Sequence, residues 1–148
     1  MLRESLALPV VDLSRAGATL RSASEEVQKV KQGPAVVVLE IGGNDLLSRR
    51  TAVDFEKDLR ALLEKLRNPE RTLVIFELPL PPFYNAYGRI QRSLAGQFRA
   101  VLIPKRLFCK VLARHGSTVD GIHLSAKGQI EMAAVVRDVL GRAVPASP

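Results

Sequence analysis

The sequence predicts an α/β fold whose strands form one largely parallel sheet. Two observations support this prediction: short apolar runs in which Val and Ile are prominent, and amphipathic helical patterns between those runs. Uninterrupted apolar runs are typical of strands that are buried on both faces. Strands that alternate with helices indicate right-handed crossovers within one sheet. The four expected strands cover residues 8–13, 35–41, 72–78 and 100–104.

The helix expected at 51–67 has the clearest pattern. Thr51 and Asp54 resemble a capping box at its start, and Glu56 and Arg60 can form an i,i+4 ion pair on its polar side. Its large apolar residues fall on one stripe that a core would bury: Phe55, Leu59, Leu62, Leu63 and Leu66.

Three further helices are expected, at 18–32, 85–98 and 126–141. The last of them would end at Gly141, because glycine commonly terminates a helix. We therefore expect a single α/β domain over residues 1–141 and a C-terminal tail at 142–148.

The composition argues against several classes of partner and site, among them nucleic acid, cysteine-based zinc and a membrane span. The chain carries a net charge of +7, but its basic residues are scattered and its aromatic residues are few. This argues against a stacking platform for nucleic acid. Cys109 is the only cysteine, which excludes an internal disulfide and a cysteine-based zinc site. Because no apolar stretch reaches about 18 residues, no membrane span is expected. We also expect no cofactor.

The stretch GGND, residues 42–45, directly follows the expected strand at 35–41. Gly42 and Gly43 allow a sharp turn there and leave room for a ligand. Asn44 offers an amide donor, and Asp45 can cap the following turn. In open α/β sheets, ligands bind beyond the carboxyl ends of strands. The same four residue types are also common in turns that have no function.

A second stretch, DGIHLS at 120–125, places Asp120 three residues before His123. An Asp in the same loop can accept a proton from one imidazole nitrogen and leave the other free as a base. A lone histidine is more often structural, so this spacing alone leaves both roles open. Metal binding is disfavoured, because no second histidine or carboxylate has ligand-like spacing with His123.

Together, GGND after a strand and DGIHLSAKG before the final helix resemble the SGNH hydrolases, also called the GDSL esterase/lipase family. The stretch DLSRAGATL at 12–20 is similar to another block of that family, whose glycine would be Gly17. The resemblance covers nearly the whole chain and implies a flavodoxin-like three-layer sandwich.

The resemblance implies roles for individual residues. His123 would be the general base and Asp120 would orient it, while Gly17 and Asn44 would donate to an oxyanion. Gly43 would border the substrate. The reaction would be hydrolysis of an ester or acetyl group on a small acylated substrate, with no metal and no cofactor.

One part of the family pattern is absent. The family begins with a strand that ends in Gly-Asp-Ser, and the sequence contains no Gly-Asp-Ser. We expect that strand to precede Met1, so the sheet would lack its first strand and could pair with a second copy of the chain. Ser14, Ser48 and Ser125 are weaker candidates for the nucleophile, and Ser125 fits better as a helix cap.

These features are compatible with several hypotheses about function. The chain could be a hydrolase whose nucleophile block lies outside it, or a split enzyme with Gly-Asp-Ser on another chain. It could instead be a non-catalytic SGNH-like binding or interaction protein. If the nucleophile block lies outside the chain, we expect the 148 residues alone to hydrolyse esters very poorly.

Overall fold

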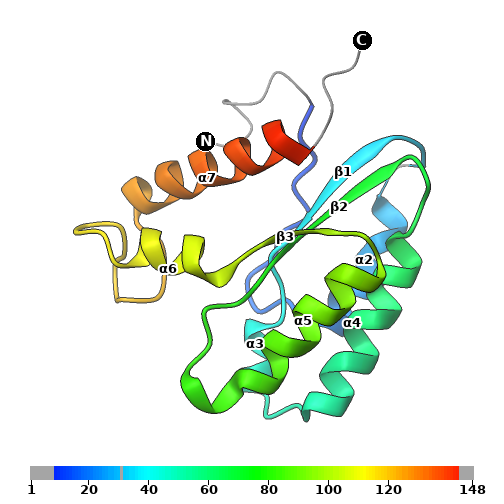
Figure 1. The fold of residues 1–148 in the computed structure, drawn as a ribbon, viewed down its shortest axis with the longest axis horizontal. Helices are drawn as coiled ribbons and strands as arrows, with labels where there is room; N and C mark the ends of the chain where they lie inside the picture. Colours follow the sequence, from blue (N-terminus) through cyan, green and yellow to red (C-terminus); the bar gives the residue numbers. More distant parts are fainter. Residues whose placement is uncertain (1–8, 31, 144–148) are drawn as a thin grey trace. The chain divides into compact units, whose positions relative to one another are not determined.

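The structure is a computed structural model that describes residues 9–30 and 32–143 (Figure 1). The chain forms two compact units. The first unit is Leu13–Leu102, and the second combines the residues up to Asp12 with those from Ile103 onward. Each unit is described by itself.

The sheet has three strands in the order β1-β2-β3: β1 is Ala35–Leu39, β2 is Arg71–Phe76 and β3 is Val101–Ile103. Strands β1 and β2 are parallel, with Ala35 opposite Arg71 and Leu39 opposite Ile75. Three of the four expected strands are therefore confirmed, as is the α/β class with a parallel sheet.

The strand expected at 8–13 is wrong for the residues that the structure describes. Residues 9–13 have no regular secondary structure, and residue 8 lies outside the described part of the chain. Val11 is 63% exposed and Leu13 is 38% exposed. An extended segment becomes a strand only when a neighbour satisfies its backbone groups, and no β-ladder includes residues 9–13.

The two paired strands differ in burial. The last four residues of β2 are all buried, as expected for a strand covered on both faces. In β1 the burial alternates, because successive side chains point to opposite faces of a sheet. Val37 and Leu39 pack against the main core cluster, while Val36 and Val38 are each 36% exposed. Burial on both faces was therefore the wrong expectation for β1.

The first unit contains the helices that cover one face of β1 and β2. They are α2 (Leu20–Glu26), which continues into the 3-10 turn η1 (Val27–Lys29), then α3 (Gly43–Leu47), α4 (Ala52–Leu66) and α5 (Asn85–Gln97), with the turn η2 (Pro82–Tyr84) before α5. The expected helices at 51–67 and 85–98 are confirmed. The helix expected at 18–32 is shorter, because it tightens into η1 after Glu26.

Local side-chain contacts explain where α4 begins. The hydroxyl of Thr51 accepts the backbone N–H of Asp54 at 3.1 Å and donates to the Asp54 carboxylate at 2.8 Å. On the polar side of the helix, Arg60 and Glu56 form the expected ion pair at 3.1 Å. Ser48, one of the weaker candidates for the nucleophile, lies at the C-terminal end of α3.

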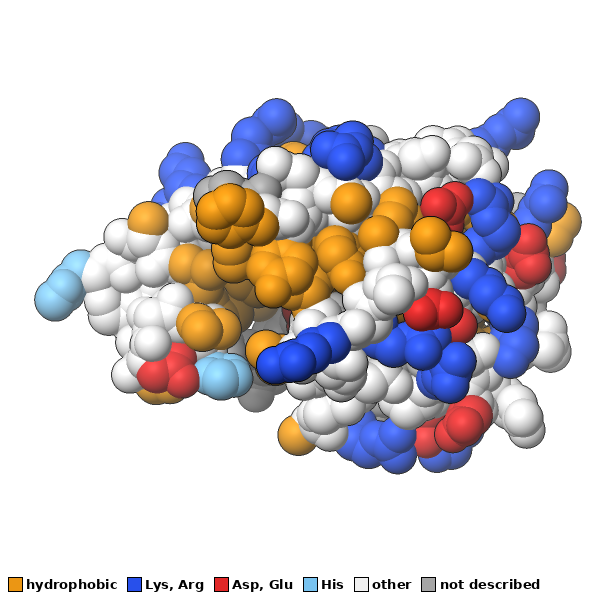
Figure 2. Space-filling model, turned by 90° about the horizontal axis from the view of Figure 1, so that it is seen from below, with side chains coloured by type: hydrophobic (Ala, Val, Ile, Leu, Met, Phe, Trp, Pro, Cys, Tyr) orange, Lys and Arg blue, Asp and Glu red, His pale blue; other side chains and the backbone are white. Residues whose placement is uncertain are grey.

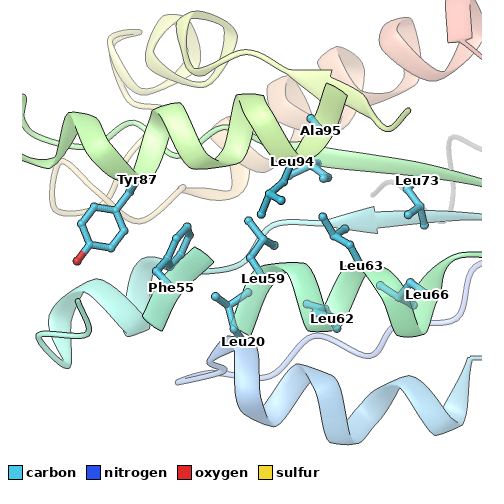
Figure 3. Close-up of a cluster of buried hydrophobic side chains, with 11 residues drawn as sticks. Leu20, Phe55, Leu59, Leu62, Leu63, Leu66, Leu73, Tyr87, Leu94 and Ala95 are labelled. Carbon is cyan, nitrogen blue, oxygen red and sulfur yellow. The ribbon is translucent and has the colours of Figure 1, made fainter. Parts of the chain in front are cut away.

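The core of the first unit lies between these helices and the sheet (Figure 3). The expected apolar stripe of α4 is confirmed, since each of its five side chains is at most 1% exposed. Leu20 of α2 and Leu94 of α5 are 0% exposed and complete the packing. The ring of Phe55 contacts that of Tyr87 edge-on, with centroids 5.0 Å apart.

The second unit contains α6 (Lys105–Leu112), which packs on α7 (Ala126–Ala143). Helix α6 was not expected from the sequence. The structure confirms α7, which continues through Arg142 and Ala143 rather than ending at Gly141. Of the expected tail, residues 144–148 lie outside the described part of the chain.

On the face drawn in Figure 2, Lys and Arg side chains are interspersed with acidic ones. Among the ion pairs of the first unit, Arg21 and Arg50 both pair with Asp58. No helix within the described ranges is both long and apolar enough to cross a membrane.

Candidate active site

The candidate oxyanion residues Gly17 and Asn44 are brought together in the first unit. The side-chain amide of Asn44, in α3, donates to the carbonyl oxygen of Ala18 at 2.9 Å. Gly17 precedes Ala18 in an exposed turn and has a φ of 74°, a backbone conformation that favours glycine. A primary amide has two N–H donors, so Asn44 can bind Ala18 with one and donate to a ligand with the other.

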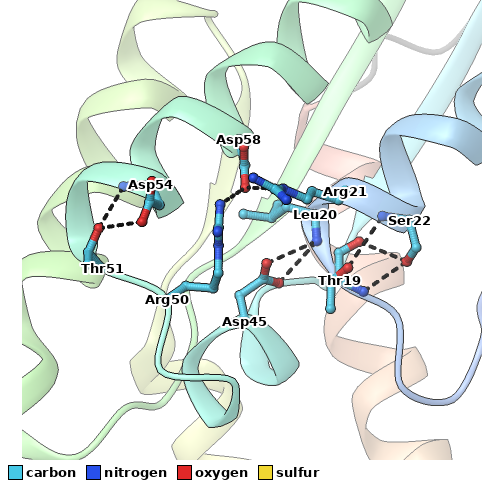
Figure 4. Close-up of polar contacts among 9 residues, drawn as sticks. All are labelled: Thr19, Leu20, Arg21, Ser22, Asp45, Arg50, Thr51, Asp54 and Asp58. Atoms are coloured by element: carbon cyan, nitrogen blue, oxygen red, sulfur yellow. Dashed lines mark hydrogen bonds and ion pairs between the residues drawn. The ribbon is translucent and has the colours of Figure 1, made fainter.

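Asp45, the residue next to Asn44, fixes the same segment at a second point. It is 2% exposed, and its carboxylate accepts the backbone N–H of Leu20 at 3.0 and 3.3 Å (Figure 4). Asp45 therefore caps the start of α2. The sequence had instead predicted that it caps the turn after residue 45. Burial raises the pKa of Asp45, and the Leu20 N–H partly opposes this rise.

Ion pairs connect the helices around the hydrogen bond between Asp45 and Leu20. Asp58 of α4 accepts Arg50 at 2.5 Å and Arg21 at 3.3 Å, and Arg21 follows Leu20 in α2 (Figure 4). The hydroxyl of Tyr87 donates to the carbonyl oxygen of Arg50. Helices α2, α4 and α5 are thus all tied to the segment around α3.

The two glycines before Asn44 have different roles. Gly42 is buried with a φ of 111°, and a Cβ there would lie 2.7 Å from the Phe55 ring and 3.2 Å from Leu78. Only glycine fits this position without displacing its neighbours. Gly43 is exposed, and a Cβ there would meet no atom within 4 Å. Gly43 therefore lies on an open surface beside Asn44.

Asp120 and His123 are brought together in the second unit. The imidazole Nδ1 lies 2.6 Å from Asp120 Oδ2, while Asp120 Oδ1 accepts the N–H groups of His123 at 2.7 Å and Ile122 at 3.0 Å. Both side chains are exposed, 77% for His123 and 51% for Asp120. All these bonds lie within one turn of four residues.

This turn sets the charge of Asp120. The backbone N–H of His123, then its imidazole, then the N–H of Ile122 lower the pKa of Asp120 to about 2. At neutral pH the carboxylate is ionised and can only accept hydrogen bonds. Nδ1 of His123 therefore carries a hydrogen, so in the neutral imidazole the lone pair is on Nε2.

The structure thus forms two pairs from the predicted site residues. In the first unit Asn44 binds Ala18, the residue next to Gly17, and in the second unit Asp120 binds His123. Ser125, a weaker nucleophile candidate, caps α7: its hydroxyl accepts the N–H of Gly128 at 3.2 Å. No group of three or more metal-ligating side chains occurs in the part of the chain that the structure describes.

Two buried polar residues of the first unit have roles that the sequence did not reveal. Asp45 was assigned only a local cap, and Gln91 of α5 was not singled out. Gln91 is 1% exposed, donates to the carbonyl oxygen of Phe76 and accepts the N–H of Leu78, each at 3.1 Å. It thereby fixes the backbone just beyond β2. A polar residue on the apolar stripe of α5 was the available signal.

Comparisons with known proteins identify the family. The sequence profile of the GDSL-like Lipase/Acylhydrolase family matches residues 1–129. Esterase TesA of Pseudomonas aeruginosa is 28% identical over 104 residues, which cover 67% of this chain and 52% of that protein. The chain therefore spans about half the length of this curated relative.

Solved structures share the fold. The crystal structure of TesA has a TM-score of 0.80 at 25% identity and covers 95% of this chain and 82% of its own. The psychrotrophic esterase EstA from Pseudoalteromonas sp. has a TM-score of 0.82 at 18% identity, with coverages of 97% and 82%. AlinE4, an SGNH-hydrolase family esterase, has a TM-score of 0.66 at 20% identity. With the profile match over most of its length, the chain belongs to the GDSL-like lipase/acylhydrolase family, the SGNH hydrolases.

Proposed function

We propose that this chain provides the base and the oxyanion hole of an SGNH-type hydrolase that cleaves an ester or acetyl group from a small acylated substrate. The observation that carries the proposal is the Asp120–His123 pair, with Nδ1 of the imidazole 2.6 Å from the carboxylate. Membership of a family of lipases and acylhydrolases supports the same reaction class.

His123 is the general base in this proposal. Asp120 holds the imidazole in the tautomer that leaves Nε2 unprotonated, and the high exposure of the ring lets a serine hydroxyl approach that nitrogen. Asp120 remains ionised throughout and stabilises the imidazolium that forms when His123 takes up the proton.

Asn44 and Gly17 donate to the developing oxyanion. As the serine Oγ attacks the carbonyl carbon, the C=O π bond opens and the oxygen becomes negative. A fixed donor at that oxygen is typically worth roughly 10²–10³ in rate. The contact between Asn44 and Ala18 keeps the amide beside the Gly17 turn and so lowers the reorganisation that binding requires.

Each turnover conserves atoms and protons. The serine proton moves to His123 and then to the departing alcohol as the ester C–O bond breaks, which leaves an acyl-serine. Water then attacks the acyl carbon, its proton passes through His123 to the serine, and the acid departs. The net reaction is ester plus water to acid plus alcohol.

The nucleophile in this proposal is the serine of a Gly-Asp-Ser segment that the 148 residues do not contain. That segment can belong to the same polypeptide or to a separate chain. Of the serines present, Ser125 already caps α7, and Ser14 lies three residues before Gly17, where no strand-to-helix turn presents its hydroxyl.

The test is hydrolysis of p-nitrophenyl acetate by the 148-residue chain, with and without an added segment that ends in Gly-Asp-Ser. The segment should raise kcat/KM by several orders of magnitude, because losing the nucleophile in triad enzymes leaves only about 10³–10⁴ over water. In the complemented enzyme, His123→Ala should abolish the gain, Asp120→Ala should reduce it strongly, and Asn44→Ala should lower kcat by roughly 10²–10³.

His115→Ala is the matched control, because His115 is the other histidine, is exposed and contributes only its backbone carbonyl, which Lys127 binds. It should leave activity unchanged. If the 148-residue chain is fully active alone and Ser14→Ala removes that activity, Ser14 is the nucleophile. The proposal that a separate Gly-Asp-Ser segment supplies the nucleophile then fails.

The absence of Gly-Asp-Ser favours one alternative, a non-catalytic SGNH-like binding protein. Such a protein would bind an acylated ligand through Asn44 and Gly17 without turnover. Saturable binding of a non-hydrolysable acyl analogue, together with inertness of the complemented chain toward a panel of esters, would support this alternative over hydrolysis.

A further inference from the structure

A close backbone contact joins helix α7 to the loop that carries Asp120 and His123. A Cβ at Gly128, in the first turn of α7, would lie 1.9 Å from the carbonyl oxygen of Ser117 and 2.9 Å from its carbonyl carbon. These two atoms belong to the backbone and cannot rotate aside. No side chain larger than hydrogen therefore fits position 128 while Ser117 stays in place.

The Ser117 carbonyl is also the base of a small hairpin. It accepts the N–H of Ser125 at 3.0 Å. Thr118 and Leu124 form an antiparallel bridge, and the N–H of Val119 donates to the His123 carbonyl at 2.9 Å. Residues 120–123 are the turn that closes this hairpin. The Asp120–His123 pair therefore sits at the tip of a hairpin whose base rests on Gly128.

Side chains fasten the same base to α7. Ser117 is 0% exposed, and its hydroxyl donates to Glu131 Oε2 at 2.7 Å. The other carboxylate oxygen of Glu131 pairs with Arg114 at 3.3 Å. The hydroxyl of Ser125 accepts the Gly128 N–H and donates to the Gly116 carbonyl at 2.5 Å. Both ends of the hairpin are thus anchored to one helix face.

We propose that Gly128 and Ser117 are positioning residues for the proposed hydrolase. They hold the hairpin against α7 and thereby keep the Asp120 carboxylate and the His123 imidazole in their productive arrangement. Neither residue contacts the substrate. The role of the pair in catalysis rests on the proposed function, whereas the close contact of the hairpin base with α7 at Gly128 stands on the geometry alone.

The direct test compares Gly128→Ala with Gly141→Ala. Both change glycine to alanine in α7, but a Cβ at Gly141 meets no atom within 4 Å. Alanine at 128 should displace the Ser117 carbonyl, break its bond to Ser125 and loosen the turn. In NMR titrations, the carboxyl pKa of Asp120 should rise from about 2 toward its ordinary value in Gly128→Ala, and hydrogen exchange at Val119 and His123 should accelerate.

A second set of variants avoids overlap in case Gly128→Ala fails to fold. Ser117→Ala removes the hydroxyl and Glu131→Ala removes its acceptor. Both should therefore raise the Asp120 pKa and accelerate hydrogen exchange at Val119 and His123, each by a smaller amount. Glu131→Gln keeps an acceptor oxygen and should restore nearly native spectra. Unchanged Asp120 titration and unchanged exchange in Gly128→Ala, or in both alanine variants, would overturn the proposal.

Activity separates this proposal from the proposed function. In the complemented enzyme, Gly128→Ala should lower kcat/KM for p-nitrophenyl acetate by roughly 10²-fold, mainly through kcat, because misplacing a base by about 1 Å can cost that much. Gly141→Ala should not change it. If wild type has no activity but the NMR shifts occur, hydrolysis is wrong and the anchoring is right. Activity of the wild type together with normal spectra in Gly128→Ala would show that hydrolysis is right and the anchoring is wrong.

Discussion

The carboxylate of Asp45 accepts the backbone N–H of Leu20, 25 residues earlier in the chain, with both oxygens. The neighbouring Asn44 donates to the Ala18 carbonyl two residues before Leu20. Two consecutive residues of α3 therefore fix the segment between Gly17 and α2, one as a donor and one as an acceptor. The candidate oxyanion site depends on this arrangement.

Asp45→Ala should destabilise the first unit by about 1–3 kcal/mol, because the buried Leu20 N–H loses its acceptor. Asp45→Asn keeps one acceptor oxygen and should cost less. Urea unfolding monitored by circular dichroism measures both free energies. Equal stabilities of wild type and Asp45→Ala would show that the cap of α2 contributes nothing.

Gly42→Ala should destabilise the chain by about 2–4 kcal/mol, because alanine is strained at a φ of 111° and its Cβ would overlap the Phe55 ring. Gly43→Ala is the matched control and should change the free energy of unfolding by less than about 1 kcal/mol. If the two variants have the same melting temperature, the close approach at Gly42 is not real.

Gln91→Leu should destabilise the first unit by about 1–3 kcal/mol, since the buried N–H of Leu78 loses the acceptor that it has in Gln91. Hydrogen exchange at Leu78 should accelerate more than exchange within β2. Gln97→Leu, at a more exposed position of the same helix, should have little effect. Identical Leu78 exchange in Gln91→Leu and wild type would contradict this.

The Asp120 turn should respond to acid in one direction. Its bonds lower the pKa of Asp120 to about 2, so the folded state binds the proton less tightly than the unfolded chain does. The stabilisation of the turn is therefore fully present above about pH 4 and is lost as the pH falls through about 2. The amide shifts of Ile122 and His123 should report this change, and Asp120→Asn should remove it. A transition centred near pH 4 instead would show that these bonds are weak in solution.

Local patterns predicted much of this fold. The stripe from Phe55 to Leu66, the cap at Thr51 and the strands around Val37 and Ile75 all depend on residue type and spacing, which sequence alone displays. The Asp120–His123 pair was equally predictable, because both residues lie in one turn of four residues and the hydrogen bonds of the Asp120 carboxylate stay within that turn. The roles predicted for Gly17 and Asn44 came from the family resemblance and stay predictions.

Features that depend on distant partners were not predictable in the same way. Residues 9–13 have the composition of a strand, but strand formation needs a neighbour. Alternating burial in β1 reflects which face the helices cover. The bond from Asp45 to Leu20 joins residues 25 apart, and the contact of Gly128 with Ser117 depends on how a hairpin meets a helix. None of these has a local signature.

In the proposed hydrolase, both pairs of residues act on one carbonyl group. A crystal structure of the chain tests it most directly, through the distance between the imidazole of His123 and the side-chain amide of Asn44. We predict a separation below about 10 Å, which one reacting carbonyl and its nucleophile can bridge. A larger separation, both with and without a bound acyl analogue, would contradict the shared site and with it the proposed reaction.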